Sequence, residues 1–325
     1  RRHWHRRRQI HDPGDQNGRK NGQRPRNLLI SPAGRVYRPD EVEQNMSIDT
    51  LPSLRHVIDA HGLAAKKSLG QNFLVDANIQ RKIVDALGAS REDEVLEIGP
   101  GRGALTRHLV DTVRRLTLVE LDDGLMEALQ GRFDERSDVN VVHGDILDVD
   151  LTALLEDAAE ARIIGNIPYN ITTPIIFRLL ERPRPREIIL MVQQEVADRI
   201  TAPVGTKAYG ALSVGIRTVA RVDRLFKVGR GAFRPVPRVD SAIVRMTPIR
   251  PEPLDSGQEE RVRRLVRAGF QWRRKQLRKI LRDHPDLRVE VARIDAVLDS
   301  LSIPPEARPE TLDPERFVAL ADALI

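Results

Sequence analysis

The chain of 325 residues contains no cysteine, which excludes disulfide bonds, thiolate metal sites and cysteine nucleophiles. It also contains no apolar run that approaches the roughly 18 residues needed to span a membrane. Its eight histidines are scattered and lack the spacing typical of paired zinc ligands. We therefore expect neither a metal centre nor a membrane segment. The lack of cysteine fits the reducing cytoplasm, where we expect the protein to act.

The positive charge of the chain comes from its first residues. Residues 1 to 45 contain 11 Lys or Arg and 5 Asp or Glu, which accounts for the whole formal net charge of +6. Residues 46 to 325 contain 42 basic and 42 acidic residues. The overall charge is therefore no evidence that the folded part binds nucleic acid, and any such argument must rest on local basic clusters.

The first 45 residues are rich in Arg, Gly, Pro, Asn and Gln, with almost no apolar periodicity, which predicts a disordered basic extension. The first methionine is Met46. We expect Met46 to be the biological start and residues 1 to 45 to be an upstream translation artefact. The alternative is a basic arm that grips RNA phosphates. Sequencing of the native N-terminus would exclude our preferred interpretation if it found residues before Met46.

From residue 51 to residue 192, strand patterns alternate with helix patterns. This alternation of apolar strands and amphipathic helices is typical of an α/β fold, in which a parallel sheet carries helices on both faces. The strands are predicted at 95–98, 116–120, 139–143, 162–165 and 188–192, and the helices at 51–62, 78–87, 104–113, 125–133 and 174–180.

The pattern changes at Pro248, Pro251 and Pro253, which mark a domain boundary. Beyond them the sequence shows helical periodicity without strands. We therefore predict a sheet domain over residues 46–250 and a small all-α domain over residues 251–325. The helices of the second domain are predicted at 259–273, 275–282, 289–298 and 314–325.

The most informative string is Asn166-Ile167-Pro168-Tyr169, just after the strand predicted at 162–165. The side-chain oxygen of Asn166 and the backbone carbonyl of Ile167 can each accept a hydrogen bond from the amino group of a nucleobase. Tyr169 offers a flat face for stacking, which is worth about 1 to 3 kcal/mol per base. The string thus predicts methylation of an exocyclic amino group. Alone, it could equally be a turn with a core tyrosine.

A glycine-rich turn at 99–103 follows the first predicted strand and is typical of a site for an adenosine-containing cofactor. Glu120, at the end of the second strand, can accept from the ribose hydroxyls of a dinucleotide or of S-adenosylmethionine. Two features favour S-adenosylmethionine. The glycines run G-x-G-x-G rather than G-x-G-x-x-G, and Asp145 follows the third strand, where it can accept from the cofactor's adenine. With Asn166, these side chains are expected at one edge of the sheet.

Over residues 51 to 325 the chain resembles the ribosomal RNA adenine dimethyltransferases of the KsgA (RsmA) type. The resemblance implies a Rossmann-like S-adenosylmethionine methyltransferase sheet followed by a helical domain that contacts RNA. It further implies two methyl groups on each of two adjacent adenosines near the 3′ end of small-subunit (16S) ribosomal RNA. The matching strings are LGQNFL at 69–74, EIGPGRG at 97–103, ELD at 120–122, GD at 144–145, NIPYNI at 166–171, QEVA at 194–197, KAYG at 207–210, FRPVPRVDS at 233–241 and RRK at 273–275.

The expected site has two halves. The target base is expected to lie between Tyr169 and Phe233, with one ring stacked on each of its faces. The reaction is expected to be an in-line displacement that needs neither a metal nor a covalent nucleophile. The target-base residues are Asn166, Ile167, Pro168, Tyr169 and Phe233. The expected S-adenosylmethionine contacts are Asn72, Leu74, Gly99, Gly101, Glu120, Asp145 and Asn166.

We expect a monomer whose partner is the ribosomal RNA of an immature small subunit. One alternative is a large-subunit RNA methyltransferase of the macrolide-resistance type, but the strings at 207–210, 233–241 and 273–275 favour the small-subunit enzymes. Another is an assembly factor whose methylation is secondary. RNA contacts are expected from local basic clusters, namely Lys66, Lys67, Lys207, Arg234, Arg238, Arg273, Arg274 and Lys275.

Overall fold

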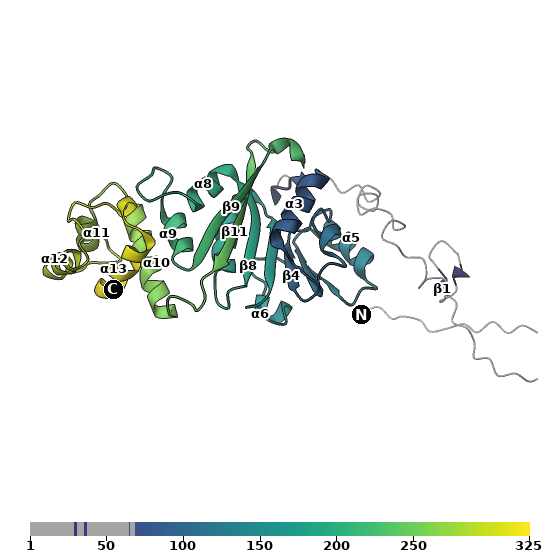
Figure 1. Ribbon diagram of the computed structural model, residues 1–325, viewed down its shortest axis with the longest axis horizontal. Helices are drawn as coiled ribbons and strands as arrows, with labels where there is room; N and C mark the ends of the chain where they lie inside the picture. Colours follow the sequence, from purple (N-terminus) through teal and green to yellow (C-terminus); the bar gives the residue numbers. More distant parts are fainter. Residues whose placement is uncertain (1–28, 31–35, 38–64, 66–68) are drawn as a thin grey trace, which may run out of the picture. The chain divides into compact units, whose positions relative to one another are not determined.

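The structure is a computed structural model that describes residues 29–30, 36–37, 65 and 69–325 (Figure 1). The chain divides into two compact units, Arg1–Ser53 and Leu54–Ile325. In the first unit, strand β1 (Leu29–Ile30) pairs antiparallel with β2 (Val36–Tyr37). The rest of the predicted basic extension, the helix predicted at 51–62, and Lys66 and Lys67 lie outside the described residues.

Seven strands of the second unit form one sheet in the order β6-β5-β4-β7-β8-β11-β9. The predicted α/β class is confirmed, but the sheet is mixed rather than wholly parallel. Strands β9 (Ala220–Val228) and β11 (Ser241–Pro248) follow each other in the chain and pair antiparallel, and β11 is also antiparallel to β8. Antiparallel neighbours need no helical crossover between them. The five parallel strands are β4 (Glu94–Ile98), β5 (Arg115–Glu120), β6 (Val139–His143), β7 (Arg162–Asn166) and β8 (Glu187–Gln193).

Each face of the sheet buries its own apolar cluster, because successive side chains of a strand point to opposite sides. Leu96 and Ile188 belong to one cluster, and their neighbours Val95 and Ile189 belong to the other. The first cluster is covered by α6 (Leu151–Leu154), α7 (Thr172–Leu179), α8 (Gln194–Ile200) and α9 (Ala211–Arg217). The second is covered by α3 (Ala77–Leu87), α4 (Thr106–Leu109) and α5 (Asp123–Phe133).

Helix α4 is much shorter than the helix predicted at 104–113, and both of its ends explain why. The glycine-rich turn continues as far as Leu105, so the helix begins only at Thr106. At the other end, Val110 has an extended ψ of 135° and Asp111 adopts a left-handed φ of 67°. Helix α4 therefore spans only four residues, although the apolar periodicity of the stretch extends further.

The C-terminal helices form a third apolar cluster, as the predicted all-α domain requires. This cluster also takes in Tyr209, which precedes α9 and whose hydroxyl donates to the Leu312 carbonyl over 2.8 Å. Figure 1 shows the helices gathered beside α9. No helix among the described residues is long and apolar enough to cross a membrane. The helices are α10 (Ser256–Gln271), α11 (Leu277–Asp283), α12 (Val291–Ser300) and α13 (Pro314–Leu324).

Candidate active site

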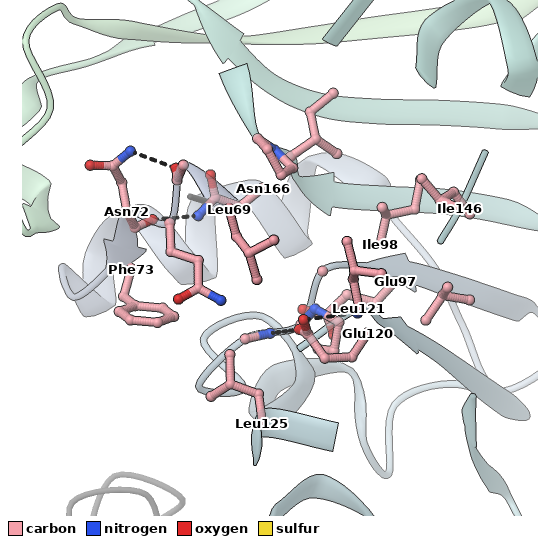
Figure 2. Close-up of a pocket in the computed structure, with 18 of the residues that line it drawn as sticks. Leu69, Asn72, Phe73, Glu97, Ile98, Glu120, Leu121, Leu125, Ile146 and Asn166 are labelled. Carbon is pink, nitrogen blue, oxygen red and sulfur yellow. Dashed lines mark hydrogen bonds between the residues drawn. The ribbon is translucent and has the colours of Figure 1, made fainter. Parts of the chain in front are cut away.

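A cavity of about 280 Å³ lies at the carboxyl ends of β4, β5, β6 and β7 (Figure 2). Parallel strands that run in the same direction end at the same edge of a sheet, so residues far apart in the sequence meet there. The 69–74 segment also lines the cavity. The predicted residues that the structure brings together around it are Asn72, Leu74, Gly99, Gly101, Glu120, Asp145, Asn166, Ile167, Pro168 and Tyr169.

The glycine-rich turn after β4 needs its glycines for conformation and for space. Gly99, Gly101 and Gly103 have φ values of 59°, 56° and 70°, in the left-handed region that favours glycine. A Cβ atom at Gly101 would lie 3.3 Å from the ring of Phe73. The turn therefore brings bare backbone to the cavity wall, as a closely bound cofactor requires.

Glu120 is held at the cavity by three backbone N–H groups. Its Oε2 accepts from Gly101 over 2.9 Å, and its Oε1 accepts from Leu121 over 3.0 Å and from Asp122 over 2.9 Å. Burial raises the pKa of this carboxyl, and the three backbone donors oppose that shift. The carboxylate is thus fixed in orientation, and its unused lone pair remains for a ribose hydroxyl.

The adenine end of the cavity combines one acidic group with apolar walls. Asp145 Oδ1 accepts from the Leu147 N–H over 2.9 Å, which leaves Oδ2 as an acceptor for an adenine amino group. Leu121, Leu125 and Ile146 also line the cavity (Figure 2). The sequence analysis did not identify these three side chains as functional. A signal was present, because Leu121 and Ile146 directly follow the acidic residues Glu120 and Asp145.

Glu97 is a second buried acid at the cavity, and the sequence analysis quoted it only as part of a string. Its side chain lies in a strand whose five residues are all buried, and Thr106 Oγ1 donates to its Oε2 over 2.7 Å. Burial, with a smaller contribution from the charge of Glu120, raises the pKa of Glu97 to about 8. An acidic residue inside an apolar strand was the signal that could have identified it.

Asn166 and Tyr169 have defined orientations at the target-base end. The Asn166 Nδ2 donates to the backbone carbonyl of Asn72 over 3.0 Å, so that the side-chain oxygen remains as an acceptor. The Tyr169 hydroxyl and the Ser241 hydroxyl are 2.6 Å apart. Among the described residues, no hydrogen bond uses the Ile167 carbonyl. Two acceptors and one aromatic ring are therefore available to a base.

Phe233 is not brought to the cavity. Its side chain is 0% exposed and packs in the same apolar cluster as Leu74. Strand β10 (Phe233–Arg234) pairs antiparallel with β3 (Phe73–Leu74), with Phe233 opposite Leu74. The ring is thus held in the core by this strand pair. Phe233 thus packs against Leu74 of the 69–74 segment. The sequence analysis had expected it to form the second wall of the base site, and in this structure it does not.

The predicted RNA-contacting residues differ in whether their side chains already bond to other parts of the protein. Lys207, Arg238, Arg274 and Lys275 are exposed. The side chains of Arg274 and Lys275 form no ion pair or hydrogen bond with residues 69–325, although the backbone N–H of Lys275 donates to the Trp272 carbonyl. Arg273 instead donates to the carbonyls of Lys207 and Thr206 over 2.9 and 3.1 Å, and Arg234 donates to the carbonyls of Gly231 and Phe233. Arg273 therefore joins the turn after α10 to the loop before α9.

The comparisons with known proteins identify the family. Residues 62–316 match the family model described as ribosomal RNA adenine dimethylase. The chain belongs to this family. Like the other family members, it is an S-adenosylmethionine-dependent ribosomal RNA adenine dimethyltransferase. Over 277 residues it is 40% identical to the ribosomal RNA small subunit methyltransferase A of Geobacillus thermodenitrificans, covering 83% of this chain and 94% of the relative.

Two solved structures of RNA methyltransferases are similar to this family member. A dimethyladenosine transferase from Plasmodium falciparum has a TM-score of 0.67 and 26% identity, with 76% of this chain and 95% of the other covered. The 23S rRNA methyltransferase ErmE has a TM-score of 0.61 and 29% identity, with 78% and 99% covered. Both support the assignment of the Rossmann-like methyltransferase fold.

The cavity fits the methyl donor of the family. S-adenosylmethionine carries a positive sulfonium, and the cavity is lined by the carboxyl groups of Glu97, Glu120 and Asp145. The apolar walls suit a purine ring, and the glycine backbone, which has no side chains, lets the rest of the cofactor approach closely. Within the described residues there is no cluster of three His, Asp or Glu side chains that could hold a metal ion.

Proposed function

We propose that this enzyme transfers two methyl groups to N6 of each of two adjacent adenosines near the 3′ end of small-subunit ribosomal RNA. The substrate is the RNA of an immature small subunit, and the enzyme acts as a monomer in the cytoplasm. The proposal rests on one observation: the side-chain oxygen of Asn166 and the backbone carbonyl of Ile167 are both available as hydrogen-bond acceptors, and both residues line the cofactor cavity. The RNA is inferred from the relative that is named as a small-subunit enzyme.

Asn166 and Ile167 activate the target by binding its amino group. The lone pair of an adenine amino nitrogen is delocalised into the ring, so the nitrogen is a poor nucleophile. Its two N–H groups donate to Asn166 Oδ1 and to the Ile167 carbonyl, which localises the lone pair and stabilises the positive charge that develops on nitrogen. S-adenosylmethionine supplies an activated methyl group with a neutral leaving group. The protein's contribution is to position and orient the base, and the product loses its proton to water.

Tyr169 and the apolar rim supply the binding energy for a base that has left its stack. The tyrosine ring lines the cavity, and its hydroxyl is tied to Ser241, so the ring is held at one angle. Stacking on an aromatic ring contributes about 1 to 3 kcal/mol, which offsets much of the cost of unstacking the base. The sugar-phosphate chain on either side of the base would then meet the exposed cations Lys207, Arg238, Arg274 and Lys275.

The decisive experiment incubates the purified enzyme with unmethylated small and large ribosomal subunits and labelled S-adenosylmethionine. Digestion of the RNA and mass spectrometry then locate each methyl group and count them. We expect dimethyladenosine at two adjacent positions of the small-subunit RNA and none in the large subunit. Label found only in large-subunit RNA would favour the second candidate, the 23S rRNA for which the structurally similar ErmE is named. Light scattering of the pure enzyme measures its molar mass in solution and so tests whether it is a monomer.

A role in subunit assembly that does not depend on methylation is the remaining alternative. All the predicted cofactor-binding residues lie at one cavity together with Asn166, Ile167 and Tyr169, which supports a protein that uses its catalytic site. A strain that lacks the enzyme can be complemented with the wild type and with Asn166→Ala, which keeps the RNA-binding surface. Equal recovery of mature small subunits with both proteins would show that methylation is secondary.

A further inference from the structure

The side chain of Asn166 is bound at one end only, by a backbone group that lies 94 positions away in the sequence. Its Nδ2 donates to the carbonyl of Asn72 over 3.0 Å, and no other hydrogen bond to the amide comes from the described residues. Figure 2 shows both residues at the cavity, Asn72 in the 69–74 segment and Asn166 at the end of β7. This single contact decides which end of the amide meets the target base.

A primary amide has two different ends, a donor NH₂ and an acceptor oxygen. If the Asn166 amide were rotated by half a turn, its oxygen would face the Asn72 carbonyl oxygen, and two acceptors would repel each other. The rotated amide would also present N–H groups to the N–H groups of an adenine amino group, so that neither could bind. The acceptor function of Asn166 therefore depends on a correctly placed carbonyl at Asn72.

Several contacts fix the position of that carbonyl. Asn72 Nδ2 donates to the Gly70 carbonyl over 3.0 Å, which closes the segment on itself. Immediately afterwards, β3 is held by its pairing with β10, by the bond from Val75 N–H to the Ala232 carbonyl over 2.8 Å and by the bond from Gln80 Nε2 to the Leu74 carbonyl over 2.9 Å. The carbonyl is thus part of a braced loop rather than a freely moving chain.

We propose that the Asn72 carbonyl is a positioning group that holds the Asn166 amide with its oxygen toward the target amino group. The inference rests on the proposed function, because it assigns a role in activating an adenine N6. It also joins the two halves of the site. The same 69–74 segment lines the cofactor cavity. The cofactor half of the site and the correct orientation of the Asn166 amide therefore require the same conformation of this segment.

The variant Asn166→Asp separates this positioning from simple acceptance. When protonated, the carboxyl group of this variant could donate to the Asn72 carbonyl and still accept from adenine with its other oxygen, as the amide does. An ionised carboxylate is a stronger acceptor but cannot donate, and it would be repelled by the Asn72 carbonyl. The positioning role therefore predicts that the variant works when protonated and fails when ionised. A requirement for an acceptor alone predicts the reverse.

Other charged groups face the same cavity and must be controlled for. They are Glu97 on β4, Glu120 on β5, Asp145 after β6, Tyr169 after β7 and Arg102 in the glycine-rich turn. The three carboxyl groups disfavour a further negative charge, which keeps a carboxyl at position 166 protonated to higher pH. Their own titration affects the wild type equally, so the informative quantity is the ratio of the variant rate to the wild-type rate at each pH.

The experiment measures single-turnover methyl transfer to unmethylated small subunits for wild type, Asn166→Asp and Asn166→Ala between about pH 6 and about pH 9. We expect the Asn166→Asp ratio to fall as pH rises, approaching roughly tenfold per pH unit once the carboxyl ionises. The Asn166→Ala ratio should be low at every pH. An Asn166→Asp ratio that is flat or rises with pH would overturn the inference. Cofactor affinity and thermal unfolding, measured at each pH, confirm that each variant is folded and loaded.

The proposed function and the positioning role can fail separately in this design. A wild type that transfers no methyl group to small subunits would refute the proposed substrate. If it methylated another RNA instead, the same three proteins and the same ratios would be measured on that RNA. A wild type that is active on small subunits, combined with a rising ratio, would refute the positioning role alone.

Discussion

The hydroxyl groups of Tyr169 and Ser241 lie 2.6 Å apart and join the turn after β7 to the first residue of β11. Ser241 is fully buried, whereas the Tyr169 side chain reaches the cavity. Burial raises the pKa of the Tyr169 hydroxyl, and the bond to Ser241 opposes that shift. A neutral phenol is thus anchored at its tip, and its ring face is left for a base.

Removal of this bond should slow methyl transfer without weakening cofactor binding. We expect Ser241→Ala or Tyr169→Phe each to cost about 1 kcal/mol, which is roughly a fivefold loss of single-turnover rate. The double variant should cost no more than one single variant, because both changes remove the same bond. Fully additive losses in this double-mutant cycle would show that the two hydroxyls act independently.

The buried acid Glu97 should make the stability of the enzyme depend on pH. Its pKa rises from 4.5 in the unfolded chain to about 8 in the folded protein, so the folded state retains a proton that the unfolded state has lost. The resulting stabilisation is complete below about pH 4.5, and it is lost progressively as the pH rises toward about 8. Its size should be on the order of a few kcal/mol. Urea unfolding without cofactor at several pH values measures it.

Glu97→Gln is the matched control, since an amide keeps the shape but does not titrate. The variant should gain stability relative to wild type as the pH rises from about 5 to about 8. Binding of the positively charged S-adenosylmethionine should release a proton from wild type near neutral pH but not from the variant. Calorimetry in buffers of different ionisation enthalpy detects that proton. Parallel pH profiles and equal proton release would contradict the assignment.

Substitutions at Phe233 should lower the stability of the fold rather than act directly on binding of the target base. Phe233→Ala should lower the free energy of unfolding by about 3 to 5 kcal/mol, and Phe233→Leu by about 1 kcal/mol, because the ring fills the core under β3. Denaturant unfolding and single-turnover assays measure both effects. If Phe233→Leu kept full stability but lost roughly tenfold or more in rate, the ring would be acting at the base after all.

Two neighbouring arginines should behave differently when each is changed to glutamine. Arg273→Gln should cost about 1 kcal/mol of stability, since the carbonyls of Lys207 and Thr206 lose a charged donor that is partly exposed. Arg274→Gln should leave stability unchanged, weaken RNA binding and reduce the salt dependence of the affinity by about one unit of slope. Filter binding at several salt concentrations tests this. Identical effects of the two variants would place both side chains on the RNA.

The sequence was sufficient wherever function depends on the ends of buried strands. Strand β6 has the predicted bounds, and Glu120, Asp145 and Asn166 meet at one edge because five apolar strands run in the same direction. The alternation of apolar strands with helices along the chain also predicted helices on both faces of the sheet, as observed. The C-terminal helices were predictable within a few residues, since each carries an apolar stripe of its own.

The sequence was insufficient where structure depends on contacts between distant residues. Strand β9 went unrecognised because it lies at the sheet edge and carries Arg221, Asp223, Arg224 and Lys227, which hide its apolar residues. The burial of Phe233 depends on the pairing of two-residue strands from opposite ends of the sheet domain. Likewise, nothing local to Arg273 shows that its guanidinium bonds to backbone carbonyls 66 and 67 positions away.

The shared use of the 69–74 segment has a consequence for the sequence of turnovers. Each adenosine receives two methyl groups, so spent cofactor must leave and fresh cofactor must enter between the two transfers. Because that segment lines the cofactor cavity and also bonds to Asn166, we expect every exchange of cofactor to weaken the binding of a singly methylated base. We expect singly methylated adenosine to build up early and then decline, and chromatography with mass spectrometry of RNA quenched at short times would follow it. The enzyme would thus complete its four methylations as separate encounters rather than in one continuous visit.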